Sequence, residues 1–256
     1  MTFLSLSVDQ FLVFFLILGR ISGFFLLAPI FGSKEMPKQI KIGLALLISL
    51  ILLPVVAPPA RAIPQEFLPF TLHLGKEILA GLVIGYASTL VFLGVMLAGQ
   101  VIDFQMGFSI VSLIDPITNL RVSIVGQLKY MISLLVFLTI NGHHLLLSAL
   151  AKSFEVSPLS TFNISQTTAD NMVSLFCNLF VIALKIGLPA IGVLLMTTVV
   201  LGILARTVPQ MNVFIVGMPL KIAVGFVALI LILPFLVVYL EQLFNAMPNE
   251  LLKLLA

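Results

Sequence analysis

Histidines, serines, a cysteine and acidic residues are the groups through which this 256-residue chain could do chemistry, and their spacing argues against catalysis. A helix-borne zinc protease needs the order H-E-x-x-H, whereas His143 and His144 are adjacent, which predicts that they point to different faces of a helix. The sequence contains neither a G-x-S-x-G nucleophile elbow nor a G-x-x-x-x-G-K-[ST] phosphate loop, and no carboxylates are paired at catalytic spacing. Cys177 is the only cysteine, so an internal disulfide cannot form. We therefore expect no catalytic, cofactor-binding or metal-binding residue, and only an unpatterned serine–histidine pair leaves an intramembrane protease open.

The composition is that of an integral membrane protein. Hydrophobic residues make up 61% of the chain and charged residues 9%, whereas soluble domains carry about 25% charged residues. The net charge of +3 is small and scattered, so nucleic acid is not expected as a partner. This composition predicts that membrane lipid surrounds the protein.

Long apolar stretches, separated by segments with proline, glycine and charge, divide the chain. They cover residues 10–31, 40–57, 72–102, 128–151, 172–205 and 211–244. Only α-helices suit such runs in lipid, because the alternating pattern of a β-barrel is absent. Each of the last two would be roughly 50 Å long against a hydrocarbon core of ~30 Å, so we expect kinks at Pro189 and Pro234 or helix outside the lipid. The predicted fold is all-α: a polytopic membrane protein of about six long, kinked helices.

Several charges lie inside these stretches, where lipid would reject them. An arginine at the centre of a membrane helix costs about 2.5–3.5 kcal/mol, and Arg20 lies near the middle of the first stretch. We expect it to be paired inside a bundle, with Glu77 or Asp103 as its partner; a water-filled pathway and a proton relay are alternatives. Other basic residues, including Lys129, are expected in connections. The charges predicted to be buried and to support assembly are Arg20, Glu77, Asp103, Lys185 and Lys221.

Gly81 and Gly85 have the G-x-x-x-G spacing that lets two membrane helices approach closely. This spacing predicts a helix contact, either within the chain or with another subunit.

Residues 106–114 form an uncharged segment that suits neither lipid nor water. As a helix it would reach roughly 14 Å, less than half the ~30 Å hydrocarbon core. Lipid would leave its backbone groups unpaired if it were a loop, so it must be buried in protein or in a pore. Gly107 permits a break after the preceding helix. Static packing against neighbouring helices is the alternative to a place in a pore.

Five blocks in order resemble one known family. They are "GRISGFFLLAPIFGSKEMPKQIKIGLALLISLILLP", "KEILAGLVIGYAS", "AGQVIDFQMGFSIVSLIDP", "FLTINGHHLLLSALAKSFEVSPL" and "ARTVPQMNVFIVGMPLKI", within about residues 10–245. The sequence resembles the flagellar biosynthetic protein FliR family, which is similar to the SctT export-gate proteins of virulence type III secretion. The run "NGHH" followed by "KSFEVSPL" favours the flagellar branch.

The resemblance implies a subunit of the flagellar type III protein export gate in the bacterial inner membrane, within the flagellar basal body. Such proteins assemble with FliP-like and FliQ-like subunits into a helical cone through which unfolded flagellar proteins pass, with FlhB and FlhA around it. A virulence-type, SctT-like gate subunit is one alternative. A small-solute transporter component is another, although the inverted repeat typical of transporters is not found.

The resemblance also implies a division of the chain and a set of site residues. Residues 1–170 would form a FliP-like helical part that includes a plug loop over 103–121, and residues 171–256 a FliQ-like helical hairpin. The implied plug and pore residues are Met106, Gly107, Phe108, Ile110, Val111, Leu113 and Ile114. The implied hairpin tip contains Arg206, Pro209, Gln210 and Asn212.

Overall fold

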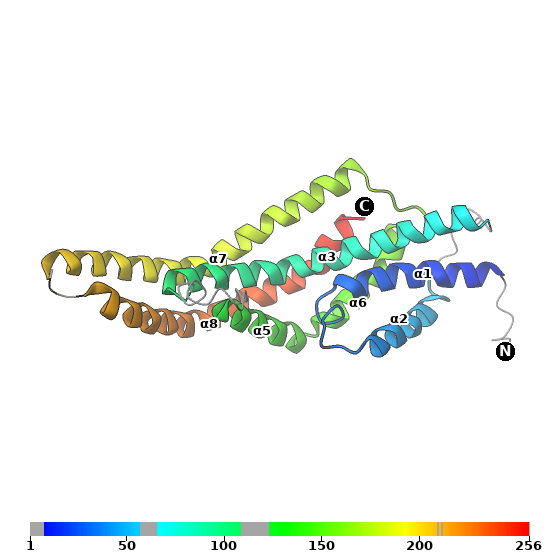
Figure 1. Ribbon diagram of the computed structural model, residues 1–256. Coiled ribbons are helices and arrows are strands. Elements are labelled where there is room, and N and C mark those ends of the chain that lie inside the picture. The colour runs from blue at the N-terminus through cyan, green and yellow to red at the C-terminus, as the bar shows by residue number, and fades with distance from the viewer. Residues whose placement is uncertain (1–7, 57–65, 109–122, 209, 211, 256) are drawn as a thin grey trace. The chain divides into compact units, whose positions relative to one another are not determined.

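A computed structural model of the chain describes residues 8–56, 66–108, 123–208, 210 and 212–255 (Figure 1). These residues form helices and turns without a strand, which confirms the predicted all-α class. The helices are α1 (Val8–Leu27), α2 (Lys38–Leu52), α3 (Phe67–Met106), α5 (Ile124–Thr139), α6 (Gly142–Val156), α7 (Gln166–Thr207) and α8 (Val213–Lys253).

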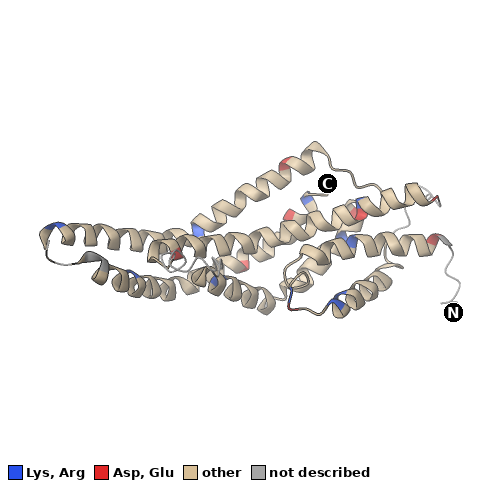
Figure 2. Cartoon of the chain, in the orientation of Figure 1, with Lys and Arg blue, Asp and Glu red and all other residues tan. Residues whose placement is uncertain are grey.

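Four helices of the described chain are long and apolar enough to cross a membrane, namely α1, α3, α7 and α8, and the bent pair α5–α6 would make a fifth span. This agrees with a multi-pass membrane protein. The second predicted stretch, 40–57, gives the 15-residue α2, which is too short to cross alone. Figure 2 shows how sparsely charged residues occur along the long helices.

The fourth predicted stretch, 128–151, is two helices rather than one. Asn141 adopts a left-handed conformation (φ 56°, ψ 33°) between α5 and α6, a conformation that asparagine tolerates better than most residues. Proline also lies within a helix elsewhere: Pro189 is inside α7.

The chain divides into two compact units that interleave in sequence. The first contains Met1–Leu90, Asn141–Phe176 and Phe244–Ala256, and the second contains Val91–Ile140 and Cys177–Leu243. The helices α3, α7 and α8 therefore each contribute to both units. The division at residue 170 into a FliP-like and a FliQ-like part, which the resemblance implied, stays a prediction.

In the first unit, glycines bring α1 and α3 into backbone contact. A Cβ atom added to Gly81 would overlap the carbonyl oxygen of Arg20, and one added to Gly23 would overlap that of Ile78. Gly85 lies against Phe24 in the same way. The G-x-x-x-G spacing thus serves a contact within the chain, so Gly81 and Gly85 are not free to dock another subunit.

The second unit is built around a core shared by α3, α5 and α7. Its fully buried members are Ile102, Met106, Val125, Ala190 and Leu194, and half-buried residues of α8 pack against them. Gly99 of α3 meets Gly126 of α5 so closely that an added Cβ would overlap the opposing backbone. This contact sets the start of α5 on the last turns of α3.

Candidate functional site

The first candidate site is a buried ion pair in the first unit. Arg20 of α1 and Glu77 of α3 both have fully buried side chains, and Arg20 Nε donates to Glu77 Oε2 at 2.6 Å. Of the two carboxylates expected as partners for Arg20, the structure therefore places Glu77 beside it. Because neither side chain reaches the surface of the chain, the pair does not line an open pathway through this unit.

The other donors of Arg20 reach the end of α6 and the turn after it. Its Nη1 donates to the carbonyl oxygen of Ser153 at 2.9 Å, and its Nη2 to that of Ser157 at 3.0 Å. The guanidinium also lies over the Phe154 ring, 4.3 Å from its centroid, which is a favourable cation–π geometry. Arg20 thus ties α1 to α6 as well as to α3.

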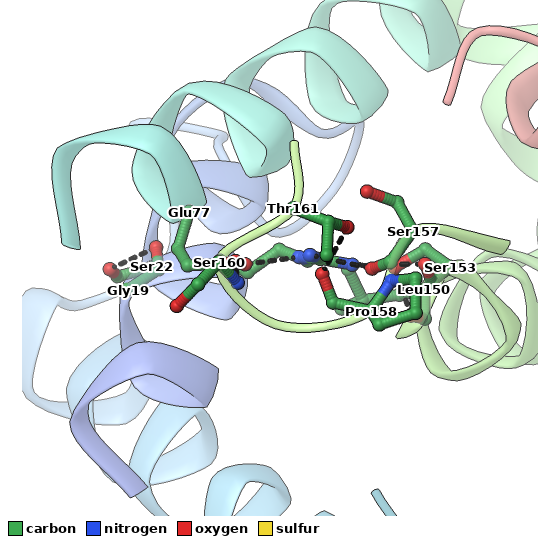
Figure 3. A network of polar contacts seen from close by, with 10 residues as sticks. Gly19, Ser22, Glu77, Leu150, Ser153, Ser157, Pro158, Ser160 and Thr161 are labelled. Atoms are coloured by element: carbon green, nitrogen blue, oxygen red, sulfur yellow. Dashed lines mark hydrogen bonds and ion pairs between the residues drawn. The ribbon is translucent and has the colours of Figure 1, made fainter. Parts of the chain in front are cut away.

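The second oxygen of Glu77 also has a partner. Its Oε1 accepts from the backbone N–H of Ser160 at 2.8 Å, and Ser160 adopts a left-handed backbone with φ 68°. Figure 3 shows Glu77 facing the turn that carries Ser157 and Ser160. The network joins three segments that are distant in sequence: α1, α3, and the end of α6 with the turn after it.

Asp103, the other predicted partner, belongs to the second unit and binds α5 instead. Its side chain is 4% exposed. The Ser123 hydroxyl donates to Asp103 Oδ2, and the Val125 N–H lies 3.2 Å from both carboxylate oxygens. Within the described ranges, no lysine or arginine forms an ion pair with Asp103.

Lys185 is not buried by its own chain, so its predicted burial stays a prediction about the assembled complex. Lys185 is exposed on α7, between Leu184 and Leu188, which are 55% and 56% exposed. The reason is that α7 packs only one face against its own chain and leaves the rest of its apolar surface open. Lys221 of α8 is half-buried.

The buried lysine that sequence reasoning missed is Lys129, which was expected in a connection. It lies inside α5 and is 3% exposed. The signal that could have found it is helical spacing, because Lys129 follows Val125 and Gly126 by four and three residues and so shares their packed face.

The first residues of the predicted plug lie in the described part of the chain and are packed. Met106 is fully buried, and a Cβ added to Gly225 of α8 would lie 2.7–2.8 Å from its side-chain atoms. Phe108 meets Phe226 edge to face, with ring centroids 6.3 Å apart. Met106 therefore acts as an anchor within its own chain rather than as exposed apolar bulk. The remaining plug residues, Ile110, Val111, Leu113 and Ile114, lie outside the described residues.

The predicted hairpin tip lies at the connection between α7 and α8. Arg206, Gln210 and Asn212 are exposed there, and Pro209 lies outside the described residues. Their exposure does not test a role for the tip, so the tip residues stay a prediction.

Groups able to do catalysis do not gather in the described residues. The rings of His143 and His144 lie against each other, with centroids 4.2 Å apart. In the same residues no group of three or more His, Cys, Asp or Glu side chains could hold a metal ion. A hollow of about 640 Å³ on α7 is lined by apolar residues and one threonine, Thr197, which supplies neither an acid nor a base.

Comparison with known proteins shows the family to which this chain belongs. Residues 11–247 match the family described as bacterial export proteins, family 1. The chain belongs to this family. It is 36% identical to the flagellar biosynthetic protein FliR of Bacillus subtilis (strain 168), over 97% of this chain and 96% of that protein. It is 32% identical to FliR of Escherichia coli (strain K12), over 90% of this chain and 87% of that one.

A virulence relative also matches. The Yop proteins translocation protein T of Yersinia pestis is 28% identical over 86% of this chain and 85% of that protein. The resemblance drawn from the sequence blocks is thereby confirmed: the chain is a FliR-type member of the type III secretion export family. This is a family of export components rather than of enzymes.

Proposed function

We propose that this chain is a subunit of the flagellar type III protein export gate. With FliP-like and FliQ-like subunits it forms the pore through which unfolded flagellar proteins cross the inner membrane, surrounded by FlhB and FlhA in the flagellar basal body. The observation that carries the proposal is the 36% identity to a FliR protein across 97% of the chain.

The surface of α7 and α8 supports a place among other subunits. The two helices have 42 and 41 residues, or roughly 60 Å each, about twice the ~30 Å hydrocarbon core. Large apolar side chains are exposed even near the connecting tip, among them Ile203 at 59% and Ile215 at 70%. Lipid cannot cover the whole of this length, so neighbouring protein is the cover that we propose.

We also propose that residues 106–115 seal the resting pore. The segment is too short to span and too apolar to be solvated, and it lies at the plug position that the resemblance implies. A hydrophobic constriction can close a pore by excluding water. The packing of Met106 and Phe108 supports a firm attachment for such a plug at the end of α3.

Affinity purification in mild detergent, followed by identification of the co-purifying chains, tests the proposal. We expect two other small membrane proteins of the FliP and FliQ types in a stable complex. Co-purification with virulence-type partners would instead assign the chain to a virulence gate. Purification of the chain alone, as a compact monomer fully protected from protease, would overturn both assignments.

A further inference from the structure

One side of α2 in the first unit is apolar and exposed. The helix packs along α1, and its buried residues are Ala45 and Ser49. Large aliphatic side chains elsewhere on the helix are 42–63% exposed: Ile40, Ile42, Leu46, Leu47, Leu50 and Ile51. A contiguous exposed apolar surface marks a place where another protein or the membrane makes contact.

The composition of this surface favours lipid over protein. Contacts between membrane helices are rich in small residues, or in polar side chains that bond across the contact. The chain follows this rule where α1 meets α3, through Gly23, Gly81 and Gly85. The exposed side of α2 instead carries leucine and isoleucine, and a Cβ added to Gly43 would meet open space. Lipid acyl chains are as apolar as leucine and need no specific pairing.

The charges of this region gather at the start of α2 and in the connection before it (Figure 2). Lys34 and Lys38 are exposed there, with the exposed Glu35 between them in sequence. Lys41 lies at the same end, and its Nζ donates to the carbonyl oxygen of Ser33 at 2.8 Å. The rest of the helix carries no charge, so one end of α2 is basic and its exposed side is aliphatic.

Helix stability does not explain the position of these lysines. The positive end of a helix dipole lies at the first turn and disfavours cations there, yet Lys38 and Lys41 occupy the first turn of α2 and no acidic residue does. An external anion would offset both the dipole and the lysine charges. A phospholipid with an anionic headgroup supplies this anion together with the acyl chains that suit the aliphatic side.

We propose that α2 is a docking surface for anionic phospholipid of the surrounding bilayer, with Lys38 at the level of the phosphate and the aliphatic side along the acyl chains. Ile42 and Leu46 follow Lys38 by four and eight residues, so they lie on the same side of the helix. Leu46 is about 12 Å from Lys38 along the axis, within the depth of one leaflet, about half of the ~30 Å hydrocarbon core. This inference goes beyond the proposed export function and does not depend on it.

A photoreactive side chain on the aliphatic side identifies what covers α2. We place p-benzoylphenylalanine at the position of Leu46, because on illumination it bonds to the lipid or protein beside it. The protein, with the subunits that co-purify, is reconstituted in nanodiscs of equal amounts of phosphatidylglycerol and phosphatidylcholine. We expect adducts of phospholipid mass, with more phosphatidylglycerol than phosphatidylcholine.

Removal of one lysine tests the preference for the anionic headgroup. Lys38→Gln should lower the ratio of phosphatidylglycerol to phosphatidylcholine adducts about fivefold, the contribution of one lysine close to an anionic membrane surface. Lys152→Gln, at an exposed position of α6 in the same unit, removes the same charge and is the matched control. It should leave the ratio unchanged.

Three results would overturn the proposal. A crosslink from position 46 to another subunit would show that protein covers this side of α2. Phospholipid adducts without a preference for phosphatidylglycerol would show that the lysines do not select the headgroup, and an equal fall of the ratio in both lysine variants would show a general effect of charge. If the chain purifies without other subunits, the proposed export function fails, and the adduct ratio of the chain alone still decides this inference.

Discussion

Burying an ion pair costs free energy, because both charges leave water. Arg20 shows how complete hydrogen bonding can offset this cost. The three guanidinium nitrogens all donate within the first unit, to Glu77, Ser153 and Ser157. Taking both charges out of water costs several kcal/mol per ion, which only such complete hydrogen bonding can offset. A pair of this kind adds little net stability, because the cost of removing both charges from water offsets most of their attraction.

Removal of one partner should be more damaging than removal of both. We expect Arg20→Leu to destabilise the complex by about 3–5 kcal/mol, because Glu77 would be left buried without its cation. The double variant Arg20→Leu with Glu77→Leu should recover part of that loss. Thermal unfolding and the yield of the purified complex measure both effects. Lys34→Leu, at an exposed position between α1 and α2, is the control, and unchanged stability of Arg20→Leu would contradict the pairing.

At the scale of the helices, close backbone contact decides which glycines are essential. Gly81→Ala places a Cβ against the carbonyl oxygen of Arg20 in the neighbouring helix, so α1 and α3 must separate and the complex should lose stability. Gly43→Ala in α2 meets nothing within 4 Å, and we expect it to stabilise by up to about 1 kcal/mol, since alanine is the better helix former. Unfolding midpoints of the two variants should move in opposite directions. Equal shifts would show that the contact between α1 and α3 is not limiting.

The segment after α3 gives a second prediction at this scale. Deleting residues 109–114 should leave the complex able to assemble, because Ile102, Met106 and Val125 of the second-unit core remain in place. The same deletion should remove the apolar barrier and let small solutes pass. Complex yield and small-solute permeability, measured in one deletion strain, check both parts. Poor assembly without a leak would instead identify a static packing segment. An intact, tight complex would contradict the plug unless a second gate closes the same path; combining the deletion with disruption of that gate must then produce the leak.

The positions of the long helices could be predicted from the sequence, whereas the contacts between those helices could not. Apolar stretches located the long helices because lipid-compatible helices need long uncharged runs, and Arg20 stood out because its charge interrupts one. The break at Asn141 was missed although Asn141 and Gly142 form a dipeptide typical of turns, because apolar residues continue on both sides of it. Sequence also could not choose between Glu77 and Asp103 for Arg20, nor show that Asp103 reaches Val125. Those choices depend on how distant segments pack, which spacing along one helix does not encode.

For the whole molecule, the exposed charge on α7 is the most direct sign of missing neighbours. Lys185 lies among exposed leucines inside a candidate membrane span, and leaving a lysine at that depth in lipid would cost about 2.5–3.5 kcal/mol. We therefore expect neighbouring protein to cover it in the assembled gate. In a Cys177→Ser background, Lys185→Cys should react with a membrane-impermeant maleimide in the isolated detergent-solubilised chain and become protected in the complex. Ala183→Cys, which the chain itself buries to 6% exposure, should stay unlabelled in both. Equal labelling of Lys185→Cys in the two states would show that this face of α7 meets lipid or water and not another subunit.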